Sequence, residues 1–140
     1  MSRDAAALVE AFERLTAAAV RRRGLDAETL APTQRVALAA LVAEGSLRLR
    51  ALAERIGTTD ATASRTVDAL ATAGLAERTA APDDRRGIVV RPTAAGRRLL
   101  ASRRRQLESV LEPGLASLPA EDRARLVGLL DELTRLLEPA

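Results

Sequence analysis

The chain has 140 residues, a length typical of one domain. It contains 30 Ala and 23 Leu but a single Phe and no Tyr or Trp, a composition that favours helices and excludes an all-β fold. Cys and His are both absent, which excludes disulfides, thiol or imidazole catalysis and the usual Zn or Cu sites, so we expect no metal and no cofactor. All 22 basic residues are Arg and the net charge is +3, while one aromatic side chain is too few for the stacking platform with which proteins bind single-stranded nucleic acid.

Two helices and a short strand are predicted in the first third of the chain. A helix over residues 4–23 has apolar side chains at steps of three and four, and three arginines followed by Gly24 provide the cations and the glycine that commonly end a helix. A second helix begins at Pro32 and closes at Gly45. Residues 46–50 alternate between apolar and charged side chains, as a short strand does.

The next two helices are short and close together in sequence. A brief helix with apolar Leu49, Leu52, Ala53 and Ile56 stops at Gly57, and a fourth helix covers residues 60–73 after a run of capping residues. This fourth helix has an apolar face and, opposite it, a stripe of small and polar side chains that lets its backbone approach another molecule closely. The apolar face consists of Ala63, Val67 and Leu70, and the stripe consists of Ala61, Ser64, Arg65 and Asp68.

A β-hairpin is predicted to follow the fourth helix. Residues 75–81 and 87–92 have the character of short strands, and the second contains the one concentrated β-branched run, at 88–90. Residues 82–87 between them are charged and rich in turn formers, so we expect an exposed tip there.

Two more helices complete the predicted chain. Thr93 can cap a long helix that runs to about residue 112, where Pro113 and Gly114 are expected to break it. The last helix covers residues 120–137 and carries leucines at helical spacing. Such a stripe can pack inside one chain, but the apolar surface of the first and last helices exceeds what one small core needs, so we expect a core shared by a dimer. The leucines are Leu126, Leu129, Leu130, Leu133, Leu136 and Leu137.

Helix, turn, helix and hairpin in this order are typical of a winged helix-turn-helix, whose second helix lies in the DNA major groove while the hairpin tip reaches the backbone or minor groove beside it. Arg65 on the stripe can pair with guanine through two hydrogen bonds, and hydroxyl groups near it can bind phosphates or base edges. An arginine at the tip can enter a narrow minor groove. The residues expected to bind double-stranded DNA are Thr59, Thr62, Ser64, Arg65, Arg85 and Arg86.

Motifs between residues 30 and 96 resemble those of the MarR family of bacterial transcriptional regulators. They cover about half of the chain in the family's order and spacing, which makes the set specific although each piece alone is weak. The matching segments are LAPTQ at 30–34, LAERIG at 52–57, ATASRTVDAL at 61–70, GLAER at 74–78, PDDRRGIVV at 82–90 and PTAAG at 92–96.

The resemblance implies a homodimer, joined by the first and last helices, and a DNA-binding wing in which Asp84 holds Arg86 in position to enter the minor groove. It also implies a repressor that is released by a small-molecule effector, because family members often bind phenolic or other aromatic compounds near the junction of their two parts. Phe12, Leu15 and Leu38 are candidates to line such a pocket, although we expect core packing for each of them.

The predicted fold is therefore mainly α with a small β-hairpin wing. A single MarR-like domain at 1–140 would combine a winged helix-turn-helix DNA-binding part at 32–92 with dimerisation helices at 4–23 and 93–137. No apolar run reaches the length of a membrane span, and the charged N-terminus does not fit a signal peptide, so we expect a cytoplasmic, ligand-responsive regulator that is not an enzyme.

The same residues allow other interpretations. A winged helix kept for its shape could bind a protein partner without reading DNA, and steep salt dependence would distinguish the two. Asp83 and Asp84 could hold a divalent metal in an enzyme, although two adjacent carboxylates on a turn form a poor cage. Arg65 could pair with Asp68 in solvent. The run of arginines at 103–105 could be a nucleic-acid patch, but three consecutive helical residues point in three directions, so a solvated face is expected.

Overall fold

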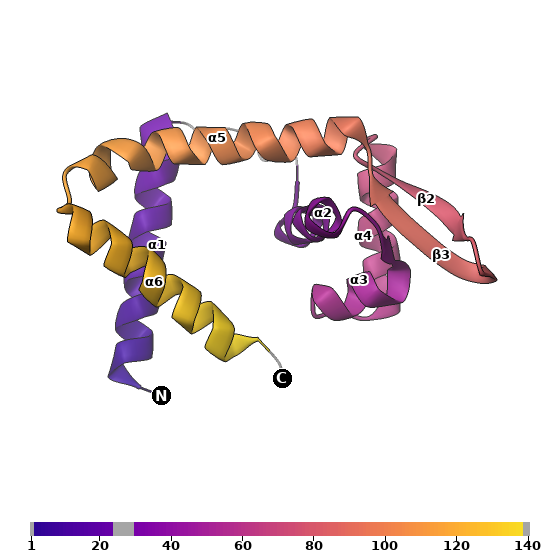
Figure 1. The fold of residues 1–140 in the computed structure, drawn as a ribbon, viewed down its shortest axis with the longest axis horizontal. Helices are drawn as coiled ribbons and strands as arrows, with labels where there is room; N and C mark the ends of the chain where they lie inside the picture. The colour runs from indigo at the N-terminus through magenta and orange to yellow at the C-terminus, as the bar shows by residue number, and fades with distance from the viewer. Residues whose placement is uncertain (1, 24–29, 139–140) are drawn as a thin grey trace. The chain divides into compact units, whose positions relative to one another are not determined.

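A computed structural model describes residues 2–23 and 30–138, without the side chains of residues 23 and 84–86. The described residues form six helices and three strands, which confirms the predicted mainly α fold with a hairpin wing (Figure 1). The helices are α1 (Arg3–Arg23), α2 (Pro32–Glu44), α3 (Leu49–Arg55), α4 (Asp60–Thr72), α5 (Ala94–Ala116) and α6 (Ala120–Leu137), and the strands are β1 (Leu47–Arg48), β2 (Ala76–Ala81) and β3 (Asp84–Pro92).

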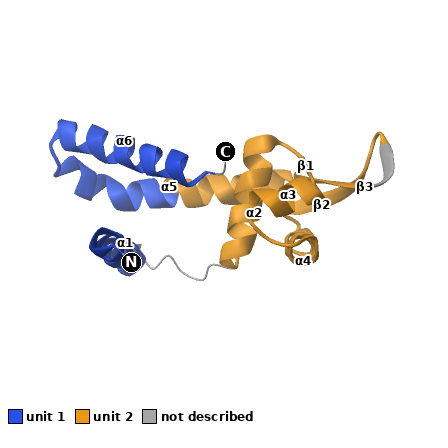
Figure 2. Cartoon of the chain, turned by 90° about the horizontal axis from the view of Figure 1, so that it is seen from below, with its two compact units in different colours: residues 1–25, 106–140 blue, residues 26–105 orange. Residues whose placement is uncertain are grey.

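The chain divides into two compact units (Figure 2). The central unit consists of residues 26–105 and contains α2, α3, α4, the three strands and the first half of α5. The terminal unit consists of residues 1–25 and 106–140 and contains α1, the second half of α5, and α6.

The hydrophobic core of the central unit lies among α2, α3, α4 and the sheet. Leu38, Leu41 and Leu52 are fully buried there. The three residues predicted on the inner face of α4 are buried as well, so the opposite stripe of that helix faces outward. The other buried members of this core are Leu30, Ala37, Ala40, Val67, Leu70, Leu75, Ala76 and Val90.

The three strands form an antiparallel sheet in the order β1-β3-β2. The strand predicted at 46–50 is confined to two residues, which pair with Val89 and Val90 of β3. It ends there because Leu49 already belongs to α3, and from that helix its side chain packs against the core. The alternating pattern was therefore a correct sign of a strand, but it included the first turn of a helix.

The hairpin tip is shorter than the sequence predicts. Ala81 pairs with Asp84 across a two-residue turn, whereas Ala80 pairs with Ile88. A register irregularity between Ala80 and Ala81 accommodates the additional residues of β3, so the charged segment at 84–86 belongs to the strand. The expectation that all of 82–87 is turn was wrong, because the irregularity lets the backbone of residues 84–87 continue β3.

The long helix α5 does not end at Pro113, which corrects a second prediction. A proline removes one backbone hydrogen bond but does not forbid the turns after it. Here the helix continues to Ala116. Arg123 of α6 donates to the carbonyl oxygens of Leu115 and Leu118, both at 3.3 Å, and so connects α6 to the end of α5 and to the residues that follow it.

The two helices at the ends of the chain keep their apolar faces exposed. No residue of α6 is buried, and its six predicted leucines are 38–75% exposed. On α1, Phe12 is 62% and Leu15 54% exposed, so the expectation that they pack in a core was wrong within one chain, whereas Leu38 is fully buried as expected. None of the helices in the described residues is long and apolar enough to cross a membrane.

The hairpin returns to the helices through a close backbone contact. Thr93 donates from its backbone N–H to the carbonyl oxygen of Leu75 at 3.0 Å and from its hydroxyl to the carbonyl oxygen of Gly74 at 2.6 Å. The Thr93 hydroxyl also accepts the backbone N–H of Gly96 at 3.1 Å, which is the predicted N-cap of α5. Gly96 lies so close that a Cβ atom built on it would be 2.2 Å from the carbonyl oxygen of Leu75.

We predict that Gly96→Ala destabilises the protein, by about 1–3 kcal/mol, because the added methyl group overlaps a backbone atom that cannot move aside freely. Chemical denaturation at one fixed protein concentration measures the effect. Gly114→Ala in the same helix is the matched control, since a Cβ there meets nothing within 4 Å. Equal stabilities of the two variants would contradict the close contact.

Candidate nucleic-acid interface

The outer face of α4 begins at a well-defined N-terminus. Gly57, with φ +70°, makes the turn after α3, and Thr59 is the N-cap of α4. The Thr59 hydroxyl accepts the backbone N–H of Thr62 at 3.1 Å and donates to the Thr62 hydroxyl, also at 3.1 Å. The capping residues seen in the sequence therefore determine where the helix starts, and they hold the two threonines together.

Arg65 lies one turn further along the same face. Its side chain is exposed, and its Nη2 is 3.4 Å from the Thr62 hydroxyl oxygen, a long contact that leaves the guanidinium accessible. The structure thus brings together the four candidate residues of this helix, Thr59, Thr62, Ser64 and Arg65, in its first two turns. Exposed Ala61 lies among them, so the backbone can approach a groove closely.

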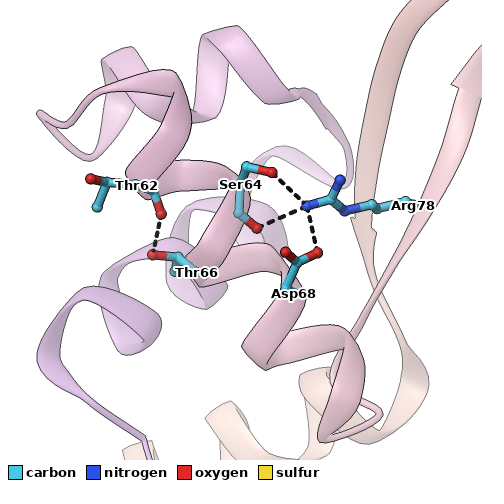
Figure 3. A network of polar contacts seen from close by, with 5 residues as sticks. All are labelled: Thr62, Ser64, Thr66, Asp68 and Arg78. Atoms are coloured by element: carbon cyan, nitrogen blue, oxygen red, sulfur yellow. Dashed lines mark hydrogen bonds and ion pairs between the residues drawn. The ribbon is translucent and has the colours of Figure 1, made fainter.

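Thr66 is the buried polar residue that the pattern of α4 did not reveal. It is 7% exposed, and its hydroxyl donates to the carbonyl oxygen of Thr62 at 2.9 Å (Figure 3). Because this bond lies within the helix, Thr66 can be buried without leaving its hydroxyl unsatisfied.

A second residue that the sequence analysis missed is Arg78 on β2. Its Nη2 donates to the carbonyl oxygen of Ser64 at 2.8 Å and to the Ser64 hydroxyl at 3.0 Å, and it forms an ion pair of 2.8 Å with Asp68 (Figure 3). Asp68 is therefore paired with Arg78, and no ion pair joins it to Arg65. One signal was available, because Arg78 is two residues from buried Ala76 and so shares the inward face of the strand.

The first three residues of β3, next to the hairpin turn, are the other candidate residues, Asp84, Arg85 and Arg86. The side chains of these three lie outside the described part of the structure, so the implied contact of Asp84 with Arg86 stays a prediction. At the neighbouring position, Asp83 accepts a hydrogen bond of 2.5 Å from Arg48 of β1, which connects the tip to the far edge of the sheet. Since Asp83 already has a cation as its partner, it is a poor metal ligand.

The described residues contain no group of three or more acidic, His or Cys side chains that could hold a metal ion. What the site offers instead is a helix face with hydroxyl groups, one exposed arginine and small side chains, next to a projecting hairpin. These are the groups that contact base edges and phosphates in duplex DNA.

Comparisons with known proteins agree with this geometry. The model of the MarR family matches residues 30–88. A probable transcriptional regulator from Pseudomonas aeruginosa is 30% identical over 94% of this chain and 97% of that chain, with a TM-score of 0.70. The chain belongs to the MarR family. No curated relative matches the sequence.

Two further MarR-like structures extend the comparison. The PcaV transcriptional regulator from Streptomyces coelicolor, solved with its natural ligand, is 25% identical over 94% of this chain and 92% of that chain, with a TM-score of 0.67. FabT from Streptococcus pneumoniae, solved with DNA, shares the fold at 18% identity over 96% of this chain and 95% of that chain, with a TM-score of 0.77.

Membership of the MarR family decides the general function. MarR proteins are transcriptional regulators that bind DNA and are not enzymes, and this chain is one of them. The alternative of a metal-dependent enzyme built on Asp83 and Asp84 is therefore wrong. In the order of the elements α4 is the second helix of the helix-turn-helix, and β2 and β3 form the hairpin that follows it.

We predict that Arg65→Ala and Arg86→Ala weaken DNA binding in different ways. Loss of Arg65 should lower the affinity ratio between an operator, selected from a random duplex library, and a base-substituted operator by about tenfold, since a bidentate arginine–guanine contact discriminates by about 1–3 kcal/mol. Loss of Arg86 should weaken both duplexes similarly and leave the subunit assembly intact. Fluorescence anisotropy measures both effects, and unchanged affinities in both variants would refute the site assignments.

Proposed function

We propose that this MarR protein is a sequence-specific repressor that binds a pseudo-palindromic operator as a homodimer and leaves it when a small-molecule effector binds. The observation that carries the proposal is the outer face of α4. It offers Arg65, the hydroxyl groups of Thr59 and Thr62, and the small side chain of Ala61 on one exposed surface beside the wing.

Sequence-specific reading is supported by the composition of that face. A solvated helix face more often carries long, flexible charged side chains, which would hold the backbone away from a partner. Here one arginine lies among small and hydroxyl-bearing residues, so its guanidinium can reach the floor of the major groove. The wing carries Arg85 and Arg86 in sequence next to its tip, and these can bind the phosphate backbone or the minor groove.

The homodimer is supported by the burial pattern of the terminal unit. Among its described residues only Ala19 and Val110 are buried apolar residues. Ten large apolar side chains of α1 and α6 are more than half exposed, among them Phe12 at 62% and Leu129 at 61%. Folded proteins rarely leave apolar surface of this extent in water, and a second copy of the same helices can cover it.

Two-fold symmetry then determines the kind of operator. In a dimer of this class the two recognition helices enter successive major grooves, with half-sites about one helical turn apart. The two half-sites of the operator would accordingly be related by a two-fold axis. A dimer bound across a promoter excludes the transcription machinery, which is the simplest route to repression.

The effector is supported by PcaV, the 25% identical relative that was solved with its natural ligand. A ligand releases the operator only if it binds the state with low DNA affinity more tightly than the DNA-bound state. This chain contains no Cys, so the release cannot come from thiol oxidation within it.

The test of sequence-specific binding is a selection of duplexes from a random library, followed by anisotropy titrations with the selected duplex and a scrambled duplex. We expect a strong preference for the selected duplex. We also expect a fall in affinity of about 10³-fold between about 50 and 200 mM salt, if the dimer makes about six phosphate contacts. No enriched sequence, together with binding that is weak and insensitive to salt, would refute the proposal and favour a protein-binding module.

The dimer has its own test. Leu129→Glu places a carboxylate on the exposed apolar face of α6, where it costs little in one chain but would be desolvated in an interface. We expect this variant to sediment as a folded monomer and to lose operator affinity, because half-sites are then bound singly. Ala124→Glu, at an exposed position on the opposite face, is the matched control and should remain dimeric. A dimeric Leu129→Glu protein would contradict this interface.

A further inference from the structure

One arginine of the wing is bonded to the face of α4 that we assign to DNA reading. The Nη2 atom of Arg78 contacts the carbonyl oxygen of Ser64 at 2.8 Å, the Ser64 hydroxyl at 3.0 Å and an Asp68 carboxylate oxygen at 2.8 Å (Figure 3). Ser64 and Asp68 are one helical turn apart. Two of the four residues of the outer stripe are therefore held by a side chain that belongs to β2.

We propose that Arg78 is a positioning residue for operator recognition: it determines the orientation of the outer stripe of α4 relative to the wing and presents the Ser64 hydroxyl to the DNA as a hydrogen-bond donor. This inference rests on the proposed function, since it says how the same surface distinguishes sequences. Arg78 acts through Ser64 and Asp68 and need not touch a base itself.

The contacts of Arg78 make the junction between β2 and α4 rigid. Hydrogen bonds from a guanidinium to a carboxylate are shorter and stronger than those between neutral groups, and three acceptors on one helix turn define a direction as well as a distance. Arg78 is partly withdrawn from solvent, with a side-chain exposure of 30%, and its Nε is buried without a partner among the described residues. The Arg78 side chain therefore occupies a site in which its Nε–H donor is unsatisfied. Such a site is understandable if the Nη2 contacts hold β2 and α4 in register.

The bond from Arg78 also restricts what the Ser64 hydroxyl can do. A serine hydroxyl has one proton to donate and can accept at two lone pairs. The bond from Arg78 occupies the oxygen as an acceptor, and within the described part of the chain the Ser64 hydroxyl donates to no group. A donor presented in the major groove selects acceptors, which are N7 and O6 of guanine, N7 of adenine and O4 of thymine. In the absence of Arg78 the hydroxyl could rotate and accept as well, and its selectivity would fall.

Arg78 also neutralises the negative charge of Asp68. The Asp68 side chain is 66% exposed on the same stripe, where an unpaired carboxylate would repel the phosphates of an approaching duplex. The ion pair with Arg78 neutralises that charge and turns the carboxylate toward β2. Asp68 can thereby occupy the reading face without opposing binding.

The test compares operator discrimination among variants of the full-length protein. Arg78→Met keeps most of the side-chain volume but removes all three contacts. We expect a fall of about tenfold in the affinity ratio between the selected operator and a duplex with a substitution at the base pair read by Ser64. Arg78→Lys keeps the charge on a shorter side chain and should lie between Arg78→Met and the wild type. Arg97→Met, which removes an exposed positive charge from α5 in the same unit, is the matched control and should keep the wild-type ratio.

A second measurement separates positioning from general loss of structure. Ser64→Ala and Arg78→Met should alter the preference at the same base pair, and the double variant should lose less than the product of the two single effects, because both remove one hydroxyl contact. Equal thermal unfolding midpoints of Arg78→Met and wild type establish that the fold is intact. If Arg78→Met unfolds, Asp68→Asn, which removes the ion pair and keeps the side-chain shape, serves in its place and should also reduce the ratio.

Each other outcome overturns a distinct statement. If wild-type protein prefers its operator but Arg78→Met discriminates equally well, the positioning role is wrong while the proposed function stands. An equal loss of affinity for every duplex, with a shallower salt dependence, would mean that Arg78 binds phosphate directly and would also overturn the role. If wild-type protein shows no preference for any duplex, the proposed function fails, and this inference fails with it.

Discussion

The structure of the central unit depends on the close approach of two backbones at the root of the hairpin. The carbonyl oxygen of Leu75 accepts the backbone N–H of Thr93 and lies where a side chain on Gly96 would be. This contact joins the end of α4, the base of the wing and the start of α5 within one small region. Any larger residue at Gly96 would separate them, and the wing would no longer have a defined direction relative to α4.

From that root, two sets of contacts orient the outer face of α4, to which we assign DNA binding. The inner face of α4 packs in the apolar core and determines which side of the helix is exposed. Core packing by itself resists sliding and rotation of α4 through apolar contacts, which have no preferred direction. The hydrogen bonds from Arg78 to Ser64 of α4 are directional and define a specific geometry. A side chain contributed by the wing is therefore one of the contacts that orient the outer face of α4.

The terminal unit differs from the central unit in how few of its apolar residues are buried. The central unit has a core of its own, but the terminal unit has two buried apolar residues among those described and long apolar faces in contact with solvent. If this unit associates with a second copy, its stability depends on protein concentration. If a second copy covers these helices, the spacing of the two recognition helices depends on the same apolar packing, and a ligand that alters the packing alters DNA affinity.

The sequence by itself determined the order of elements, the inner and outer faces of α4 and the capping role of Thr59 and Thr93, because hydrophobic periodicity and capping are local properties of the chain. The tertiary structure decided the features that depend on contacts between residues far apart in the sequence. Leu49 fits both the strand pattern at 46–50 and the helix after it, and the structure places it in the helix. α5 continues past Pro113, and Phe12 remains exposed although its spacing is that of a core residue. The partnership of Arg78 with Ser64 and Asp68 joins residues 10 to 14 positions apart on a helix and a strand, and no periodicity within either element can specify such a contact.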